Sequence, residues 1–134
     1  MKTVVLQVST GRSPTVLNLT RECARFVAGE GDGLLSVFVP HATAGVAVLE
    51  LGAGSDDDLL RALESVLPAD SRWAHRHGSA GHGRDHVLPA FIAPSIVVPV
   101  LDGQLALGIW QSIALVDTNG DNPDREVRLS MLGN

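Results

Sequence analysis

The sequence predicts an α+β fold in a single domain that spans residues 1–134. A length of 134 residues suits one domain, and no linker, repeat or low-complexity tract divides the chain. Two helical patterns lie between strand patterns in the first half, whereas the second half is a run of strands joined by tight turns. A doubly wound sheet would need strands and helices to alternate to the end of the chain, so this order favours α+β.

Composition supports a folded domain with an aliphatic core. Hydrophobic residues make up 45% of the chain, charged residues 19%, and tyrosine is absent. The net charge of −5 argues against a nucleic-acid partner, and no apolar stretch approaches the roughly 20 residues needed to cross a membrane. The N-terminus lacks an apolar signal core and Cys23 is the only cysteine, so we expect a cytoplasmic protein without an internal disulfide.

The first two elements are a strand and a helix. Apolar and polar residues alternate over residues 3–9, which predicts a half-buried strand. Residues 20–28 carry apolar side chains at helical spacing, with Thr20 as the expected N-cap. Cys23 lies on the apolar face of this helix, which favours a small buried side chain over a nucleophile.

Two strands and a second helix follow. Strands are expected over residues 33–40 and 44–50, and the second is apolar on both faces, which predicts an interior position. A helix over residues 56–67 begins after Ser55, the expected cap. Asp56–Asp58 then lie in the first turn, where the helix dipole favours negative charge, so they indicate a helix start rather than a metal site.

The second half ends in strands. They are expected at Ser95–Leu101, Leu105–Val116 and Asp124–Leu132. Asp102-Gly103 has the composition of a tight hairpin turn, and residues 119–123 form the next turn. Pro99 cannot donate a ladder hydrogen bond, so its strand is expected at an edge or with a bulge there. Polar and apolar residues alternate in the last strand, which predicts one solvent-facing side.

Histidines are the most informative polar residues. All five lie between positions 41 and 86, and four fall within twelve residues, at His75, His77, His82 and His86. Imidazole is the commonest metal ligand, and catalytic zinc usually takes three protein ligands. The spacing is weak support, because His82 and His86 would share a face only on a helix, which Gly81 and Gly83 disfavour. Solvated loop histidines are the alternative.

Two further candidates lie beside the expected strand over residues 44–50. His41 precedes a turn of small residues that a ligand can approach closely. Glu50 ends the strand, and a buried carboxylate there would need a histidine, an arginine or a metal as its partner. The alternative is an exposed carboxylate just past the strand.

The remaining candidates are an amide, an indole and two guanidinium groups. Gln111 shares an otherwise apolar strand face, so its amide either serves a ligand or histidine or bonds to nearby backbone. Trp110 faces the other way, as a core or subunit contact. Arg84 and Arg125 are candidate anion clamps, with simple solvation as the alternative. No P-loop, dinucleotide-binding turn or nucleophile elbow is present.

Several of these residues together resemble the YjbQ family, often described as secondary thiamine-phosphate synthases. The shared pattern is His41-Ala42-Thr43-Ala44, Glu50, Trp73-x-His75, His86, Pro94-Ser95, Gly103 and Gly108-Ile109-Trp110-Gln111. The resemblance implies a mostly antiparallel, β-sandwich-like core with two or three helices. It also implies a homotrimer with a pocket at the subunit contacts.

The resemblance further implies an activity and a site. The activity joins a pyrimidine pyrophosphate to a thiazole phosphate and releases pyrophosphate. Glu50 and His41 would be catalytic, and a divalent metal, zinc or magnesium, would be held by His41, His75 and His86. The small anionic substrate would be bound by Arg84, Ser95 and Gln111.

Four positions depart from the family pattern. Ala42, Leu49 and Ile109 replace polar residues of the family, and His82 stands where an asparagine is common. These changes leave two other functions open. One is a metal-dependent hydrolase of a small phosphorylated or acylated metabolite, and the other is a non-enzymatic trimer that binds a metal or an anion.

Overall fold

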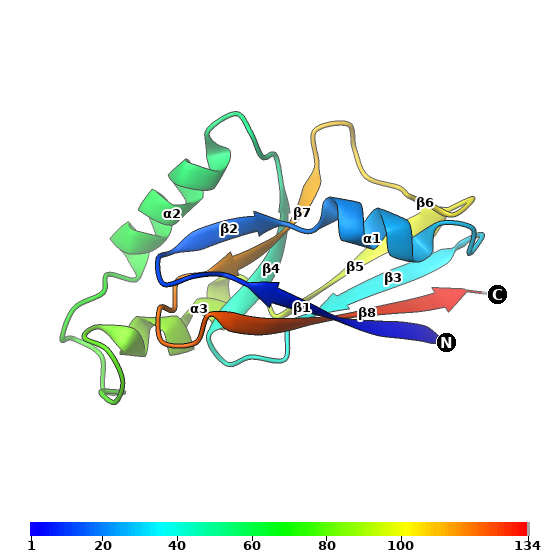
Figure 1. The fold of residues 1–134 in the computed structure, drawn as a ribbon. Coiled ribbons are helices and arrows are strands. Elements are labelled where there is room, and N and C mark those ends of the chain that lie inside the picture. The colour runs from blue at the N-terminus through cyan, green and yellow to red at the C-terminus, as the bar shows by residue number, and fades with distance from the viewer. Residues whose placement is uncertain (134) are drawn as a thin grey trace.

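Two antiparallel sheets form the framework of the computed structural model, which describes residues 1–133 (Figure 1). The larger sheet has the order β1-β8-β3-β5-β6, and its strands are β1 (Lys2–Ser9), β8 (Asp124–Gly133), β3 (Gly33–Phe38), β5 (Ser95–Leu101) and β6 (Gln104–Leu105). The smaller has the order β2-β7-β4, with β2 (Thr15–Asn18), β7 (Ser112–Asp117) and β4 (Ala44–Leu49). The predicted α+β class is thereby confirmed.

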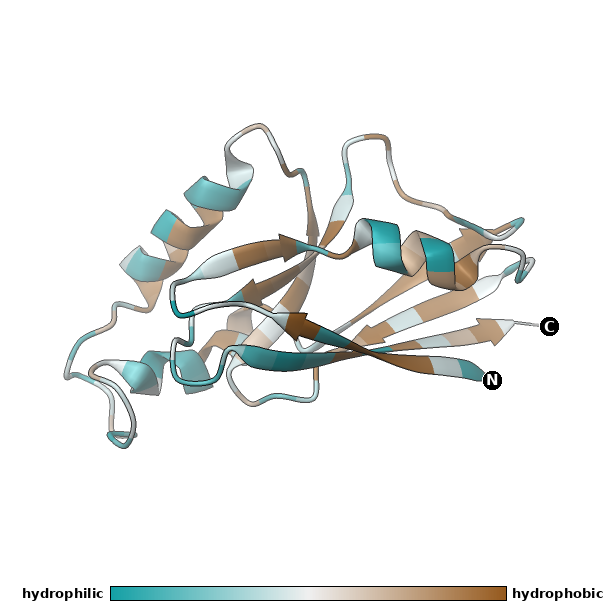
Figure 2. Ribbon diagram, viewed as in Figure 1, coloured by the Kyte–Doolittle hydropathy of each residue, from teal (hydrophilic) through white to brown (hydrophobic). Residues whose placement is uncertain are grey.

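Three α-helices and a 3₁₀ helix complete the fold, and they are α1 (Thr20–Val27), α2 (Ser55–Val66), η1 (His82–His86) and α3 (Leu88–Phe91). The main core combines buried side chains of α1 with those of both sheets. A second apolar cluster joins α2 and α3 to Val116 of β7. Both longer helices carry hydrophilic as well as hydrophobic residues (Figure 2), and their buried residues, such as Phe26 and Leu63, are apolar. Among the described residues, no helix combines the length and apolar character that a membrane crossing requires.

Several local expectations are confirmed. Along β8, Val127, Leu129 and Met131 are buried. The Asp102-Gly103 turn has positive φ at both residues, 49° and 69°, as a tight hairpin between β5 and β6 requires. Cys23 is fully buried, and this burial raises the pKa of its thiol to about 12, which disfavours the thiolate that a nucleophile needs.

The long strand expected over Leu105–Val116 is wrong. The chain leaves the larger sheet after β6 and enters the smaller sheet at β7, with residues 106–111 as the crossing. The apolar pattern runs through this crossing because Leu107 packs against the same core as Leu105 and Ile113. The alternation of apolar residues therefore indicated burial in one core. It could not show that two sheets contribute to that core.

β4 is also placed differently from the expectation. It is an edge strand that pairs only with β7 in the described sheets, so an interior position is wrong. Its two faces are apolar because Val46 lies in the main core while Ala47 packs on the second cluster. The open side of the strand is covered by the segment before β5, where Ala93 accepts a hydrogen bond from the Val46 amide at 2.8 Å.

Neither predicted cap residue caps its helix. Ser55 is the first residue of α2 and follows Gly54, which has a φ of 100°. Thr20 lies within α1, and its Oγ1 accepts a hydrogen bond from the Ile113 amide at 2.9 Å. Thr20 therefore ties the helix start to β7, a contact between segments 93 residues apart that sequence patterns do not report.

Candidate metal centre

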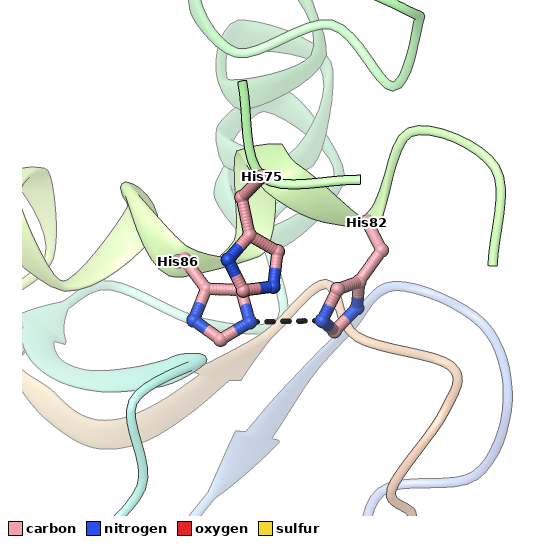
Figure 3. A group of neighbouring side chains, drawn as sticks. All are labelled: His75, His82 and His86. Atoms are coloured by element: carbon pink, nitrogen blue, oxygen red, sulfur yellow. Dashed lines mark hydrogen bonds between the residues drawn. The ribbon is translucent and has the colours of Figure 1, made fainter. Parts of the chain in front are cut away.

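Three imidazoles converge on one point beside η1 (Figure 3). The ligand nitrogens of His75, His82 and His86 all lie within 4.8 Å of one another. The Nε2 atoms of His82 and His86 are 2.8 Å apart, and the His75 ring is centred 3.9 Å from that of His86. We call these three residues the histidine trio. His77 lies at its edge, with its ring 4.0 Å from His75.

Glycines make this convergence possible. A Cβ on Gly83 would lie 2.5 Å from both the His75 carbonyl oxygen and Trp73 Cβ, so only glycine lets η1 pack directly on the loop that carries His75. Gly81, with a φ of 76°, starts the 3₁₀ helix. The sequence suggested that these glycines disfavour a helix, but a short 3₁₀ helix forms here. Local propensity is outweighed by close packing of two backbone segments.

Two carboxylates lie beside Nδ1 of His82, the ring nitrogen that does not face His86. Its Nδ1 lies 2.9 Å from Asp121 Oδ2 and 3.6 Å from Asp85 Oδ2. Ser79 donates to Asp121 from its backbone and its hydroxyl, which lowers the pKa of that carboxyl. Asp85 accepts a hydrogen bond from Thr118 at 2.6 Å, while burial raises its pKa. Neither carboxylate makes a hydrogen bond to Nδ1 among the described residues, but both lie on the side of the ring where a carboxylate commonly orients a metal-binding histidine.

Two members of the trio, His75 and His86, favour the neutral imidazole. Burial lowers the pKa of His75, and the nearby imidazoles His77 and His82 lower it further. Burial is also the first cause of the lowered pKa of His86. Neutral imidazole is the form that ligates metal ions. In addition, the buried Nε2 of His75 has no hydrogen-bond partner among residues 1–133, so a nitrogen that could ligate a metal is left unsatisfied.

Two hollows flank the trio. One, of about 260 Å³, is lined by Trp73, His75, His82 and the loop at 78–81. The other, of about 380 Å³, we call the donor hollow, and its lining includes His41, His77, His82, His86, Asn119, Asp121, Asn122 and Arg125. His82 borders both hollows, so a ligand could reach the trio from either side.

His41 enters the site differently from the expectation. Its Nε2 accepts a hydrogen bond from the Glu126 backbone amide at 2.8 Å, so that nitrogen is occupied. Burial, followed by the Arg125 guanidinium, lowers the pKa of His41 and favours its neutral form. The structure thus puts His82, in place of His41, in the trio with His75 and His86.

Nearly the whole chain is similar to one family of known proteins. The model of the UPF0047 protein YjbQ-like family matches residues 4–134. The chain belongs to this family. UPF0047 protein Rv2556c of Mycobacterium tuberculosis is 58% identical over 132 residues, which cover 98% of each chain.

Solved structures of similar proteins share the fold. A hypothetical protein from Aeropyrum pernix, APE1520, superposes with a TM-score of 0.90 at 33% identity and 100% coverage of both chains. A YbjQ-like protein of unknown function from Sulfolobus solfataricus gives a TM-score of 0.91 at 26% identity, with 99% and 97% covered. The fold is therefore shared with these proteins over essentially the whole chain.

Two residues that match the YjbQ pattern lie away from the trio. Glu50 is exposed just beyond β4, and Gln111 is exposed just before β7. Thr43 and Asn119 line the hollow beside the trio and adjoin the opposite end of the β4–β7 ladder, whose five strand steps span about 16 Å. Gln111 belongs to no strand, so its expected place on a strand face is wrong. Its Oε1 accepts a hydrogen bond from the Gly108 amide at 2.7 Å, which is the structural alternative.

The other two predicted substrate-binding residues also lie outside both hollows. The buried guanidinium of Arg84 pairs with Glu64 and donates to the Leu67 carbonyl at 3.0 Å, which fastens the end of α2 to η1. Ser95 is the first residue of β5, exposed and paired with Phe38. Within one chain, Arg84 is thus a structural contact and Ser95 stands apart from the trio.

Sequence reasoning missed His82 as a member of the trio, and Asp85 and Asp121 as its partners. The departure from the family pattern at His82 was the available signal, because it adds an imidazole four residues before His86. Nothing in the sequence marked Asp121, which comes 39 residues after His82 and meets it only through the turn that follows β7.

Proposed function

We propose that this protein is a metal-dependent enzyme that acts on a small phosphorylated metabolite. The observation that supports it most directly is the histidine trio, with His82 backed by Asp121 and Asp85. Tetrahedral zinc bound by imidazole nitrogens at 2.0–2.1 Å would hold them about 3.3 Å apart, between the 2.8 Å and 4.8 Å found in the trio. Three nitrogens suit zinc, whereas magnesium prefers oxygen, so zinc is the better candidate.

A bound ion of this type would polarise a phosphoryl oxygen and stabilise the charge on a phosphate-containing leaving group. With three protein ligands, a position remains open toward the hollows. The thiamine-phosphate synthase reaction releases pyrophosphate and belongs to this class of chemistry, so it is the first reaction to test. Hydrolysis of a phosphate ester at the same position is the second.

We also propose that the working form is a homotrimer. Ile109 is 87% exposed and Trp110 is 70% exposed, so neither is a core residue, and such apolar side chains favour a covered surface. Glu50 and Gln111 lie at the same end of the β4–β7 ladder as this pair. A trimer interface there would let Glu50 of one chain complete the site of another. Sedimentation equilibrium should give three times the 14.1 kDa chain mass, and a single-chain mass would contradict the proposal.

Removing one member of the trio tests the metal site. Tag-free protein supplied with zinc and freed of excess should retain about one ion per chain. His82→Ala should lower the affinity for zinc by more than about 100-fold, because loss of a ligand exceeds the 10–100-fold typical of an outer partner. His77→Ala is the matched control, since it removes a neighbouring imidazole that lies outside the trio. Elemental analysis and competition with a chelator measure both.

Turnover is then measured on the zinc-loaded protein. A pyrimidine pyrophosphate with a thiazole phosphate, and separately a panel of phosphate esters, should yield product with the wild type and none with His82→Ala. A wild type that retains no zinc contradicts the metal site. Zinc retention without turnover of any phosphorylated compound contradicts the enzyme and leaves a metal-binding protein.

A further inference from the structure

The donor hollow has an unusual supply of hydrogen-bond donors. His41 is one of them. Because its Nε2 accepts from the Glu126 amide, a neutral His41 carries its proton on Nδ1. The imidazole is thus held in one tautomer, with a single N–H left for a ligand. The Glu126 contact makes this donor rigid, because the backbone of β8 fixes the ring.

In both asparagines of the hollow, as in His41, the acceptor atom is used by a backbone amide and the donor is left over. The Oδ1 of Asn119 accepts from the Asp121 amide at 2.6 Å, and the Oδ1 of Asn122 accepts from the Asp124 amide at 3.2 Å. The carbonyl half of each side chain is therefore used within the turn. No hydrogen bond in residues 1–133 uses either amide nitrogen, so each NH₂ group is a spare donor at the hollow.

Arg125 contributes the fourth donor. Its Nε and Nη2 bond to Asp117 at 2.8 Å and 3.1 Å, and Nη2 also donates to Thr43 Oγ1 at 2.8 Å. The remaining Nη1 has no hydrogen bond within the described part of the chain, while the side chain borders the hollow. The guanidinium is thus anchored by two nitrogens and presents its third.

We propose that the donor hollow is a binding site for the phosphoryl group of the substrate, with His41 Nδ1–H, Arg125 Nη1 and the amides of Asn119 and Asn122 as its donors. This inference rests on the proposed function, because His82 and His86 border the same hollow and would set a bound ion beside the phosphate. Tetrahedral phosphate oxygens need several converging donors, which this arrangement offers.

Charge makes the two sites interdependent. Asp117 balances Arg125, and Asp121 borders the hollow, so the protein charges alone give an anion little attraction. A divalent cation in the trio adds two positive charges at the edge of the hollow. Inorganic phosphate should therefore bind the zinc-loaded protein at least about tenfold more tightly than the zinc-free protein.

A pair of variants separates the two nitrogens of His41. The amide of glutamine reaches about as far as Nε2, so His41→Gln keeps an acceptor for the Glu126 amide and loses the Nδ1 donor. The amide of asparagine reaches about as far as Nδ1, so His41→Asn keeps a donor and loses the anchor. Titration calorimetry with inorganic phosphate on zinc-loaded protein should show about tenfold or more weakening for His41→Gln, and less for His41→Asn.

Asn122→Asp supplies an independent test. It keeps the Oδ1 acceptor for the Asp124 amide and turns the exposed NH₂ donor into a charged oxygen, so phosphate binding should be lost with the turn intact. Ser95→Ala, outside the hollow, is the control and should bind phosphate as the wild type does. Zinc content is measured for every variant, alongside the melting temperature.

The outcomes separate this inference from the metal site. Full zinc content with no phosphate binding, or equal binding by wild type, His41→Gln and Asn122→Asp, would overturn the phosphoryl site and leave the metal site standing. Weaker binding by His41→Asn than by His41→Gln would overturn the assignment of Nδ1–H as the donor. Failure to retain zinc contradicts the proposed function instead, and equally tight phosphate binding with and without zinc overturns the coupling.

Discussion

Replacing Gly83 by alanine is expected to weaken metal binding by at least about tenfold, although Gly83 offers no ligand atom. A Cβ at this position would lie 2.5 Å from the His75 carbonyl oxygen and from Trp73 Cβ. Carbon atoms in contact prefer 3.5–4.0 Å, so the His75 loop must retreat from η1 by roughly 1 Å. That movement separates His75 from His82 and His86, and zinc affinity should fall by about 10–100-fold or more.

Chelator competition on the zinc-loaded variant measures this loss. Gly108→Ala is the matched control, because its added Cβ would meet only the end of the Gln111 side chain, at 3.3 Å, and the position is remote from the trio. Circular dichroism should show that Gly83→Ala keeps its sheets, since the main core lies between α1 and the strands. Wild-type zinc affinity in a folded Gly83→Ala protein would show that the close approach is not needed.

Asp117→Asn is expected to destabilise the fold by about 3–5 kcal/mol. Asp117 is 1% exposed, and besides Arg125 it accepts hydrogen bonds from Thr10 at 2.6 Å and from the Asn119 amide at 2.9 Å. Asparagine would leave the buried Arg125 charge without its counter-ion and would set an NH₂ group against existing donors. Removing one member of a buried ion pair has a cost of this size because the remaining charge stays desolvated.

Urea unfolding followed by circular dichroism gives the change in the free energy of unfolding. Asp70→Asn is the control, since Asp70 and Arg72 form an exposed pair that should contribute less than about 1 kcal/mol. A similar small change for Asp117→Asn would mean that Arg125 finds water or another partner. The same variant should also disturb the donor hollow, because Asp117 anchors two nitrogens of Arg125.

Much of the fold was predictable because its signals are local. Alternation along β8 and the Asp102-Gly103 turn each depend on neighbours in the chain, and both are confirmed. The single strand predicted over Leu105–Val116 is wrong for a physical reason. Burial sets the alternation of apolar residues, and here one core receives side chains from two sheets. The predicted cap at Thr20 is wrong for a similar reason, because its hydroxyl accepts a hydrogen bond from a backbone amide of β7.

In the candidate site, too, local features were predictable from the sequence and long-range contacts were not. Four histidines within twelve residues indicated a cluster, but their spacing could not predict which imidazoles lie in contact. Gly83 looked like a helix breaker, whereas packing against the His75 loop makes it necessary. His41 looked like a ligand, whereas the Glu126 amide occupies its Nε2. Each of these outcomes depends on contacts between segments that only folding brings together.

By itself, then, the sequence determined the α+β class, most strand and helix positions and the presence of a histidine cluster, because periodicity, turn chemistry and composition act over a few residues. The tertiary structure decided the trio of His75, His82 and His86 and the carboxylates behind it. It also decided the four donors of the hollow, drawn from positions 41 to 125. Hydrogen bonds and coordination need atoms within about 3 Å, and that proximity is set by how the two sheets and η1 pack together.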